Sequence, residues 1–145
     1  MSSQTAGAAA GAGRVSTAVN IVSWTFRLLA AAILLQTLFF KFTAAPESVY
    51  IFSKVHAEPW GRIATGGVEL IAAFLLLTPR LAWLGSLLAG GVMVGAILTH
   101  LTVLGIEVQG DRGLLFGLAL TVLASAGASL YLHRRDIPVL GGRLA

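Results

Sequence analysis

Four polar side chains stand in stretches of this sequence that are otherwise apolar: Gln36, Lys41, Glu69 and His100. Ionisable groups are costly inside an apolar environment, so they are usually either paired or used for function. Glu69 can keep its charge beside a cation, or it can be protonated, because loss of water disfavours the charged form. Lys41 has the best reach to Glu69, and His100 is second. Both a structural polar network and a ligand or proton site remain open.

Composition places these residues in a membrane protein. The chain is 57% hydrophobic and 11% charged, with a mean hydropathy of +0.86, whereas soluble domains average about 25% charged residues. The net charge is +4, but Lys and Arg flank the apolar runs, which is typical of membrane anchors rather than of nucleic-acid binding. The sequence contains no cysteine, which excludes thiol catalysis and thiolate metal sites. His100 is the only embedded His and only Met93 could be a second axial ligand, so neither haem nor another metal is expected.

The apolar runs predict an all-α fold, an integral membrane four-helix bundle. Each is long enough to cross a hydrocarbon core, which takes about 20 residues, and they cover about 21–42, 60–77, 81–103 and 112–132. Pro79 separates the second helix from the third. Pro46 and Glu47 begin a short amphipathic helix between the first two spans, and we expect it to lie at the membrane interface.

One domain, residues 20–133, is expected between two tails. Residues 1–19 are small and polar and predict a disordered tail, and residues 134–145 form a polar C-terminal tail. A cleaved signal peptide is the competing interpretation of the N-terminus. The apolar run is too long for that, and it carries Arg27 and Gln36.

The positions of Lys and Arg predict the orientation. One side of the bundle has more of them, five Arg against three Lys and Arg on the other: Arg14, Arg80, Arg134, Arg135 and Arg143 against Lys41, Lys54 and Arg112. The positive-inside rule therefore predicts that both termini are cytoplasmic. Arg27 and Lys41 are expected to be anchors whose long side chains reach the head-group region. Gln36 is expected to face another helix. The four polar residues then lie in the non-cytoplasmic half, in a pocket that opens outward.

Small residues at intervals of four predict close helix packing. In lipid, such residues let two helices approach and gain dispersion contacts. The expected packing positions are Gly91 and Gly95 in the third helix, and Gly113, Gly117, Thr121 and Ser125 in the fourth.

Three short motifs carry a family resemblance. They are Leu38-Phe39-Phe40-Lys41-Phe42, Gly66-Gly67-Val68-Glu69-Leu70 and Gly110-Asp111-Arg112-Gly113-Leu114-Leu115. In these motifs the chain resembles the DoxX / DoxX-like family of small bacterial and archaeal membrane proteins. The resemblance implies a four-helix membrane fold in a prokaryotic inner membrane and an association with membrane redox chemistry, since the namesake members are a subunit of a thiosulfate:quinone oxidoreductase. It marks Lys41 and Glu69 as characteristic residues, whereas His100 rests on the reasoning above.

Two functional hypotheses follow. In the first, the chain is a membrane subunit or quinone-handling component of a redox complex, with a non-covalently bound quinone in the pocket. A chain of 15.1 kDa has no room for a redox cofactor domain, so such a complex needs a redox partner subunit, and whether this chain is itself an enzyme stays open. In the second, it is a non-catalytic scaffold, small-molecule binder or permease component. Both predict contact with the lipid bilayer and a homo- or hetero-oligomer, without nucleic acid.

Overall fold

The computed structural model describes residues 2–138, with side chains described from residue 17 onward, and over this range every regular element is a helix. The all-α prediction is therefore confirmed. The elements, in chain order, are α1 (Ser2–Phe42), α2 (Pro46–Lys54), α3 (Trp60–Leu77), the 3₁₀ turn η1 (Pro79–Leu81), α4 (Ala82–Thr99), the π-helical turn η2 (His100–Leu104), α5 (Leu114–Leu132) and the 3₁₀ turn η3 (Arg134–Asp136).

Four stretches of these helices are long and apolar enough to cross a membrane, which makes the chain a multi-pass membrane protein. They are Thr17–Phe42, Trp60–Leu77, Pro79–Leu104 and Leu114–Leu132. The third predicted helix is thus an α-helix that ends in a π-helical turn. The fourth begins two residues later than predicted, because Gly113 has a φ of 80° in the left-handed region and so lies outside the helix.

The structure describes the two predicted tails to different extents. Helix α1 begins at Ser2 rather than near Ile21, so the stretch predicted to be a disordered tail has a helical backbone. Alanine is frequent there and proline is absent, and both features favour a continuous helix. In the predicted polar C-terminal tail, Arg134–Asp136 forms a short 3₁₀ turn, and residues 139–145 lie outside the described residues.

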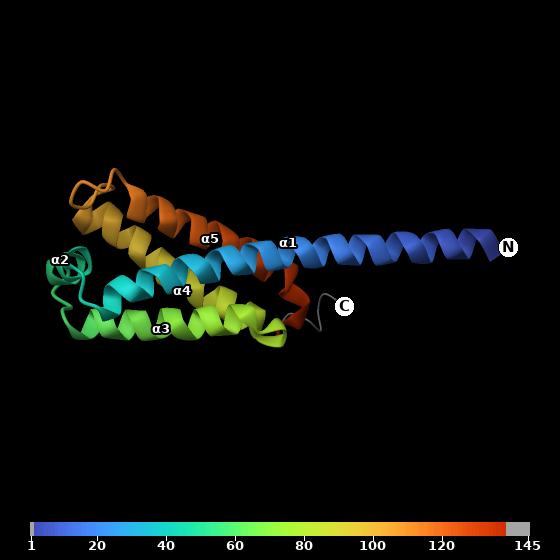
Figure 1. The fold of residues 1–145 in the computed structure, drawn as a ribbon, viewed down its shortest axis with the longest axis horizontal. Coiled ribbons are helices and arrows are strands. Elements are labelled where there is room, and N and C mark those ends of the chain that lie inside the picture. Colours follow the sequence, from blue (N-terminus) through green and yellow to red (C-terminus); the bar gives the residue numbers. More distant parts are fainter. Residues whose placement is uncertain (1, 139–145) are drawn as a thin grey trace.

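The spanning helices form two antiparallel pairs, α1 with α3 and α4 with α5 (Figure 1). At the end of the bundle that contains η1, the pairs lie close together. Toward the other end they diverge, and α2 lies across that end. The close approach is possible because the contact is made by small residues: a Cβ on Gly85 of α4 would lie 2.5 Å from the backbone nitrogen of Leu76 in α3. Ala72, Ala82 and Ala89 around it are fully buried.

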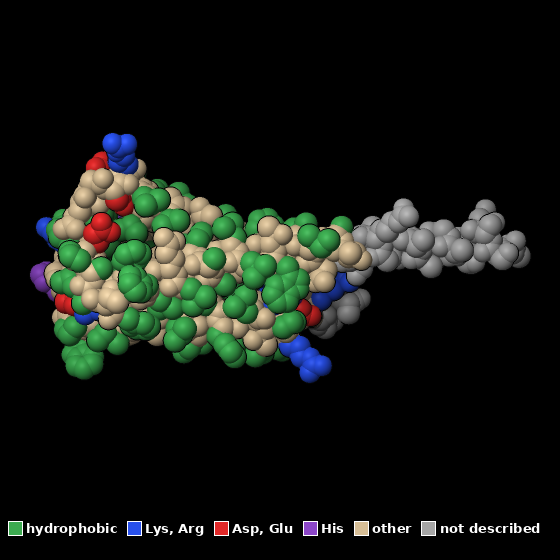
Figure 2. All heavy atoms as spheres, in the orientation of Figure 1, with side chains coloured by type: hydrophobic (Ala, Val, Ile, Leu, Met, Phe, Trp, Pro, Cys, Tyr) green, Lys and Arg blue, Asp and Glu red, His purple; other side chains and the backbone are tan. Residues whose placement is uncertain are grey.

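The surface is consistent with a position in a bilayer. Hydrophobic side chains cover the middle of the face shown in Figure 2, and the charged side chains gather toward the two ends of the bundle. Large apolar side chains that face outward include Phe39, Phe74 and Leu98, which are 65%, 70% and 54% exposed. Exposure of this kind carries no cost against lipid tails, which are equally apolar.

Four of the six predicted packing positions lie on the outer surface of this chain and one precedes α5, so only one packs inside the bundle; packing of the outer four against another chain stays a prediction. A Cβ on Gly91, Gly95 or Gly117 would have no neighbour within 4 Å, and Thr121 is exposed. Gly113 is the residue before α5 rather than a packing residue. Only Ser125 is buried inside the bundle, where it is 2% exposed.

Helix geometry explains why a row of small residues spaced four apart does not stay on the inner face of a helix. Residues four apart on an α-helix are offset by about 40°, so a row with this spacing turns gradually around the helix. The row on α5 starts on the outer face at Gly117 and Thr121, and it reaches the inner face only at Ser125 and Ser129. Ser129 there forms a 2.9 Å hydrogen bond with Ser86 of α4.

Arg27 is a second departure from the prediction, because it is not an anchor at the head groups. Its side chain is the largest fully buried one in the described residues, at 1% exposed. Its Nε donates a 2.5 Å hydrogen bond to the carbonyl of Leu76 in the last turn of α3, and its guanidinium lies 3.9 Å from the centroid of the Trp24 ring. The last carbonyls of a helix lack partners within that helix. Arg27 supplies such a partner to the Leu76 carbonyl of α3, which explains why the Arg27 side chain points inward.

Candidate functional site

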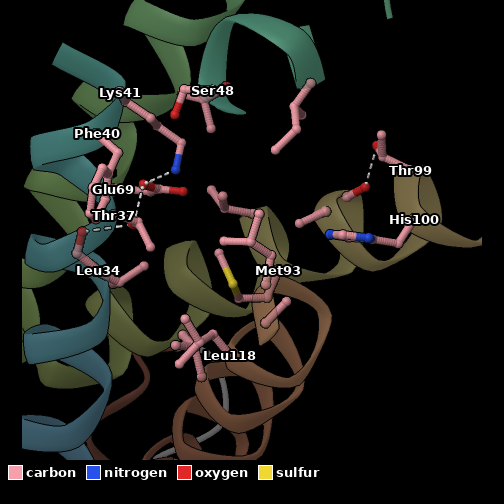
Figure 3. A pocket seen from close by; sticks show the side chains of 18 of the residues that line it. Leu34, Thr37, Phe40, Lys41, Ser48, Glu69, Met93, Thr99, His100 and Leu118 are labelled. Carbon is pink, nitrogen blue, oxygen red and sulfur yellow. Dashed lines mark hydrogen bonds and ion pairs between the residues drawn. The ribbon is translucent and has the colours of Figure 1, made fainter. Parts of the chain in front are cut away.

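A cavity of about 770 Å³ lies between the two helix pairs at the α2 end of the bundle. Its walls come from all four spanning helices, α2 lies across its end, and most of its lining is apolar. The polar side chains that line it are Gln36, Thr37, Lys41, Glu47, Ser48, Thr65, Glu69, Thr99, His100 and Asp111. Figure 3 shows that several of them come from opposite sides of this space.

An ion pair forms the polar wall on the α1/α3 side. Lys41 Nζ of α1 lies 3.0 Å from Glu69 Oε2 of α3 (Figure 3), and the Glu69 side chain is 3% exposed. Thr37 Oγ1 lies 3.2 Å from the same carboxylate oxygen and 2.9 Å from the carbonyl of Leu34. A hydroxyl has one hydrogen, so Thr37 donates to only one of them at a time. Glu69 is therefore paired with Lys41, the partner expected from reach.

Arg62 fixes the end of α1 that carries Lys41. Its Nη1 donates to the backbone carbonyl of Lys41, and its Nη2 lies 2.8 Å from Glu58 Oε1 in the segment before α3. The Arg62 side chain is 8% exposed. Because one end of this guanidinium fork binds a carboxylate and the other a helix carbonyl, it sets the position of the last turn of α1 relative to α3.

His100 forms the polar wall on the α4/α5 side. Its ring Nδ1 lies 2.8 Å from the carbonyl of Gly105; since a carbonyl only accepts, Nδ1 carries the hydrogen. The Gly105 N–H in turn donates to the His100 carbonyl at 2.7 Å. Gly105 has a φ of 79°, which suits glycine. Phe116 meets the ring edge-on with centroids 5.5 Å apart. The imidazole is thus held in one tautomer.

The π-helical turn orients this imidazole. A single π turn in an α-helix often marks a functional site, because it changes the direction of the side chains it carries. Here it begins at His100, which is 5% exposed. The ring points into the cavity in Figure 3, on the opposite side from the Lys41–Glu69 pair. The second ring nitrogen, Nε2, accepts no hydrogen bond from the described residues and is available to a ligand.

Asp111 is a cavity residue for which the sequence reasoning proposed no role. Its Oδ1 accepts from the N–H groups of Val108 and Gly113 at 2.9 and 2.8 Å, and its Oδ2 accepts from Leu115 N–H at 3.0 Å. Desolvation alone would raise the pKa of Asp111, but these three donors together with nearby His100 bring it below the usual value. Asp111 therefore stays ionised, fixes the start of α5 and presents negative charge toward His100. The signal was its place in the Gly110-Asp111-Arg112-Gly113 motif.

All four residues predicted for the pocket line the cavity, although not as one connected group. Lys41 and Glu69 are in contact, whereas within residues 2–138 neither a hydrogen bond nor an ion pair joins His100 to either of them. Gln36 departs from its prediction: it lines the cavity but is exposed at the outer side of α1 rather than turned toward another helix. Thr37 and Arg62 were missed, because the partners that tie them to the site, Glu69 and the Lys41 carbonyl, lie 32 and 21 residues away in the sequence.

Comparisons with protein-family models, with curated proteins and with solved structures give no match. The site therefore has to be interpreted from its own chemistry. Within residues 2–138, no three His, Asp or Glu side chains come together in a way that could hold a metal ion. The groups present can donate hydrogen bonds, accept them and exchange protons: an ammonium paired with a carboxylate on one side, and an imidazole beside a carboxylate on the other.

Proposed function

We propose that this chain binds a quinone between its two helix pairs and is the quinone-handling membrane subunit of a redox complex. The observation that carries the proposal is the division of the cavity into two polar walls separated by an apolar interior. Small-molecule sites are mostly apolar, with a few placed polar groups and volumes of about 300–1,000 Å³. The cavity of about 770 Å³ falls in that range.

The chemistry of a quinone fits these two walls. A quinone ring is flat and apolar, with a carbonyl oxygen at each of two opposite edges, so it needs a hydrogen-bond donor on each side. Lys41 supplies an ammonium donor on the α1/α3 side. On the α4/α5 side, His100 Nε2 donates when the ring is protonated and accepts from a quinol hydroxyl when it is neutral. Glu69 and Asp111 keep a negative charge close to each of these donors.

The residues of this chain would bind the ring and move protons, while a partner subunit would supply or take the electrons. Reduction of a quinone to a quinol consumes two electrons and two protons. His100 and the Lys41–Glu69 pair each lie where a proton could pass to one oxygen. The resemblance to the DoxX family supports a redox role, a prokaryotic inner membrane and a partner subunit, and the positive-inside rule supports cytoplasmic termini.

The test is to identify what the purified protein binds. The full chain would be extracted from its own membrane in mild detergent, and its bound small molecules would be measured by mass spectrometry. We expect about one quinone per chain, reduced severalfold in Glu69→Gln and His100→Ala. Arg80→Gln is the matched control, because Arg80 is exposed at the opposite end. Thermal unfolding of each variant would separate loss of ligand from loss of fold.

A non-catalytic membrane protein is the second candidate. It is favoured by one observation, that Glu69 and Lys41 already neutralise each other and so form a complete structural contact without a ligand. Under this alternative, no quinone is recovered from the wild type, and Glu69→Gln lowers the unfolding temperature without changing the proteins that co-purify.

A further inference from the structure

The cavity is closed toward the middle of the bundle and open at one side of its α2 end. Between α1 and α5, the closed part is formed by Leu34 and Val122, which are 1% and 0% exposed. About two turns nearer to α2, the same cavity is lined by Phe40 and Leu114, which are 45% and 62% exposed. The seam between α1 and α5 is therefore sealed at one level and open at the next.

Helix α2 covers the other seams of the cavity more fully than it covers the seam between α1 and α5. Its main contacts are with α1, α3 and η2, the turn that continues α4. Four of its residues line that end of the cavity together with Val55 after it, namely Glu47, Ser48, Ile51 and Phe52, and Ser48 is buried. Since α2 bridges α1, α3 and the end of α4, the α1/α5 seam is the least covered side. At the seam between α3 and α4, Val68 is 37% exposed and Gly95 is exposed as well, so what distinguishes this seam is α2, which contacts α3 and η2 at its end.

The α1/α5 opening is apolar and lies within the spanning helices. Phe40 and Leu114 belong to the stretches Thr17–Phe42 and Leu114–Leu132, and Leu118 lies one turn further along α5. The rim thus begins at the ends of the spanning segments, and its inner part, at Gln36 and Leu118 one turn deeper, faces lipid tails rather than water. This rim is formed by Phe40, Leu114 and Leu118, which are apolar, and by Gln36, which is polar.

We infer that the seam between α1 and α5 is a lateral entrance from the bilayer, through which a ligand with a polar head and a long apolar tail enters. The inference rests on the proposed function and narrows its ligand class. The head lies between Lys41 and His100, and the tail passes between Gln36 and Phe40 on one side and Leu114 and Leu118 on the other. The tail stays among the lipids, so its length needs no matching space inside a chain of 15.1 kDa.

The test is photolabelling of the wild-type chain in lipid nanodiscs. The labelling reagent is a benzoquinone with a decyl tail that ends in a diazirine, and the competitor is decylbenzoquinone in excess. Labelled peptides would be mapped by mass spectrometry. We expect competable labelling to concentrate on Gln36, Phe40, Leu114 and Leu118, because these residues flank the expected path of the tail.

The other outcomes are distinct. Competable labelling concentrated on Val68 and Gly95 would place the tail in the α3/α4 seam and overturn the lateral entrance proposed here, while the quinone site would stand. Labelling concentrated on α2 would overturn it in favour of entry from the aqueous side. If no labelling is competable, the proposed function fails and the entrance fails with it.

A matched pair of variants tests the same inference by rate. Leu118→Trp adds bulk in the α1/α5 seam, and Leu120→Trp adds the same bulk on the outer face of α5, where Leu120 is 44% exposed and does not line the cavity. We expect Leu118→Trp to slow exchange of the tailed quinone between nanodiscs and vesicles severalfold, and Leu120→Trp to leave it nearly unchanged. The reverse order would overturn the inference.

Discussion

Different interactions join the two helices within each pair. Between α1 and α3, Arg27 binds the carbonyl of Leu76 at one end, and Arg62 binds the carbonyl of Lys41 at the other. The Lys41–Glu69 ion pair lies on the cavity side. Between α4 and α5, Ser86 and Ser129 form a neutral hydrogen bond. In lipid, apolar surface gives little drive for association. Charged and helix-end contacts therefore fix α1 against α3, whereas a neutral hydrogen bond and buried core residues, among them Ala89 and Ala126, join α4 to α5.

The largest effect should come from breaking the α1/α3 pair at Arg27. Arg27→Ala removes a fully buried side chain and leaves the Leu76 carbonyl without its donor. We expect a loss of about 3 kcal/mol in the free energy of unfolding, measured by denaturant titration in mixed micelles. Arg27→Met keeps most of the volume and removes the charge, so it should cost less. Equal stability of the alanine variant and the wild type would contradict the role of Arg27.

The contact between the pairs should be the next most sensitive. A Cβ on Gly85 would lie 2.5 Å from Leu76 N and 2.8 Å from Leu75 C, both backbone atoms that cannot move aside. Gly85→Ala should therefore cost about 2 kcal/mol. Gly91→Ala is the matched control on the same helix, where a Cβ meets nothing within 4 Å; it should be neutral or stabilising by less than about 1 kcal/mol. If both variants lose equal stability, the close approach at Gly85 is not what holds the pairs together.

Asp111 should make the α4/α5 pair sensitive to acid. Because its pKa is lowered in the folded protein, its contribution to stability is complete above the unfolded value of about 3.9 and is lost as the pH falls through the folded value. Asp111→Asn should cost about 1 kcal/mol at neutral pH, as loss of a helix-capping carboxylate does, and this difference should shrink below about pH 4. Unfolding temperatures from pH 7 down to pH 3 would measure it. A constant difference across that range would be the contrary result.

The smallest effect is expected at the hydroxyl pair between α4 and α5. Hydrogen bonds between membrane helices contribute about 0.6 kcal/mol on average, so Ser86→Ala should cost about that much. The Ser86→Ala and Ser129→Ala double variant should cost little more, because the two changes remove the same bond. Additive losses would show that each serine acts through other contacts. A loss as large as that of Arg27→Ala would remove the contrast between the two pairs.

The sequence predicted the elements better than the direction in which their residues face. The second helix was predicted at 60–77 and is found at Trp60–Leu77, because Trp60 and Pro79 mark both ends. The short helix α2 follows from Pro46 and Glu47 in the same way. The side of a membrane helix that faces the bundle interior is harder to predict, since the outer side is as apolar as the core. Gly91 and Gly117 gave a clear spacing signal and still lie outside.

The candidate site could be predicted only in part, for a related reason. Rare charges in apolar runs are conspicuous, so Lys41, Glu69 and His100 were found directly. The helix-end partners were not, because Arg27 and Arg62 bind backbone carbonyls, and a carbonyl has no signature in the sequence. Asp111 lies in a loop where an acidic residue is ordinary, so its place in a short motif was the one sequence signal, and its role is seen only from its three backbone donors.

The contact of Arg27 also has a consequence for how the chain is inserted into the membrane during synthesis. Arg27 precedes its acceptor, the Leu76 carbonyl, by 49 residues, so α1 is made well before the end of α3 exists. Until then its guanidinium lacks that carbonyl and has only the Trp24 ring of its own helix beside it, and an Arg without a hydrogen-bond acceptor in an apolar environment is unfavourable. Helix α1 should therefore stay beside the insertion machinery, or with its arginine near the head groups, until α3 arrives. The two helices would then enter the bilayer as a hairpin rather than one after the other.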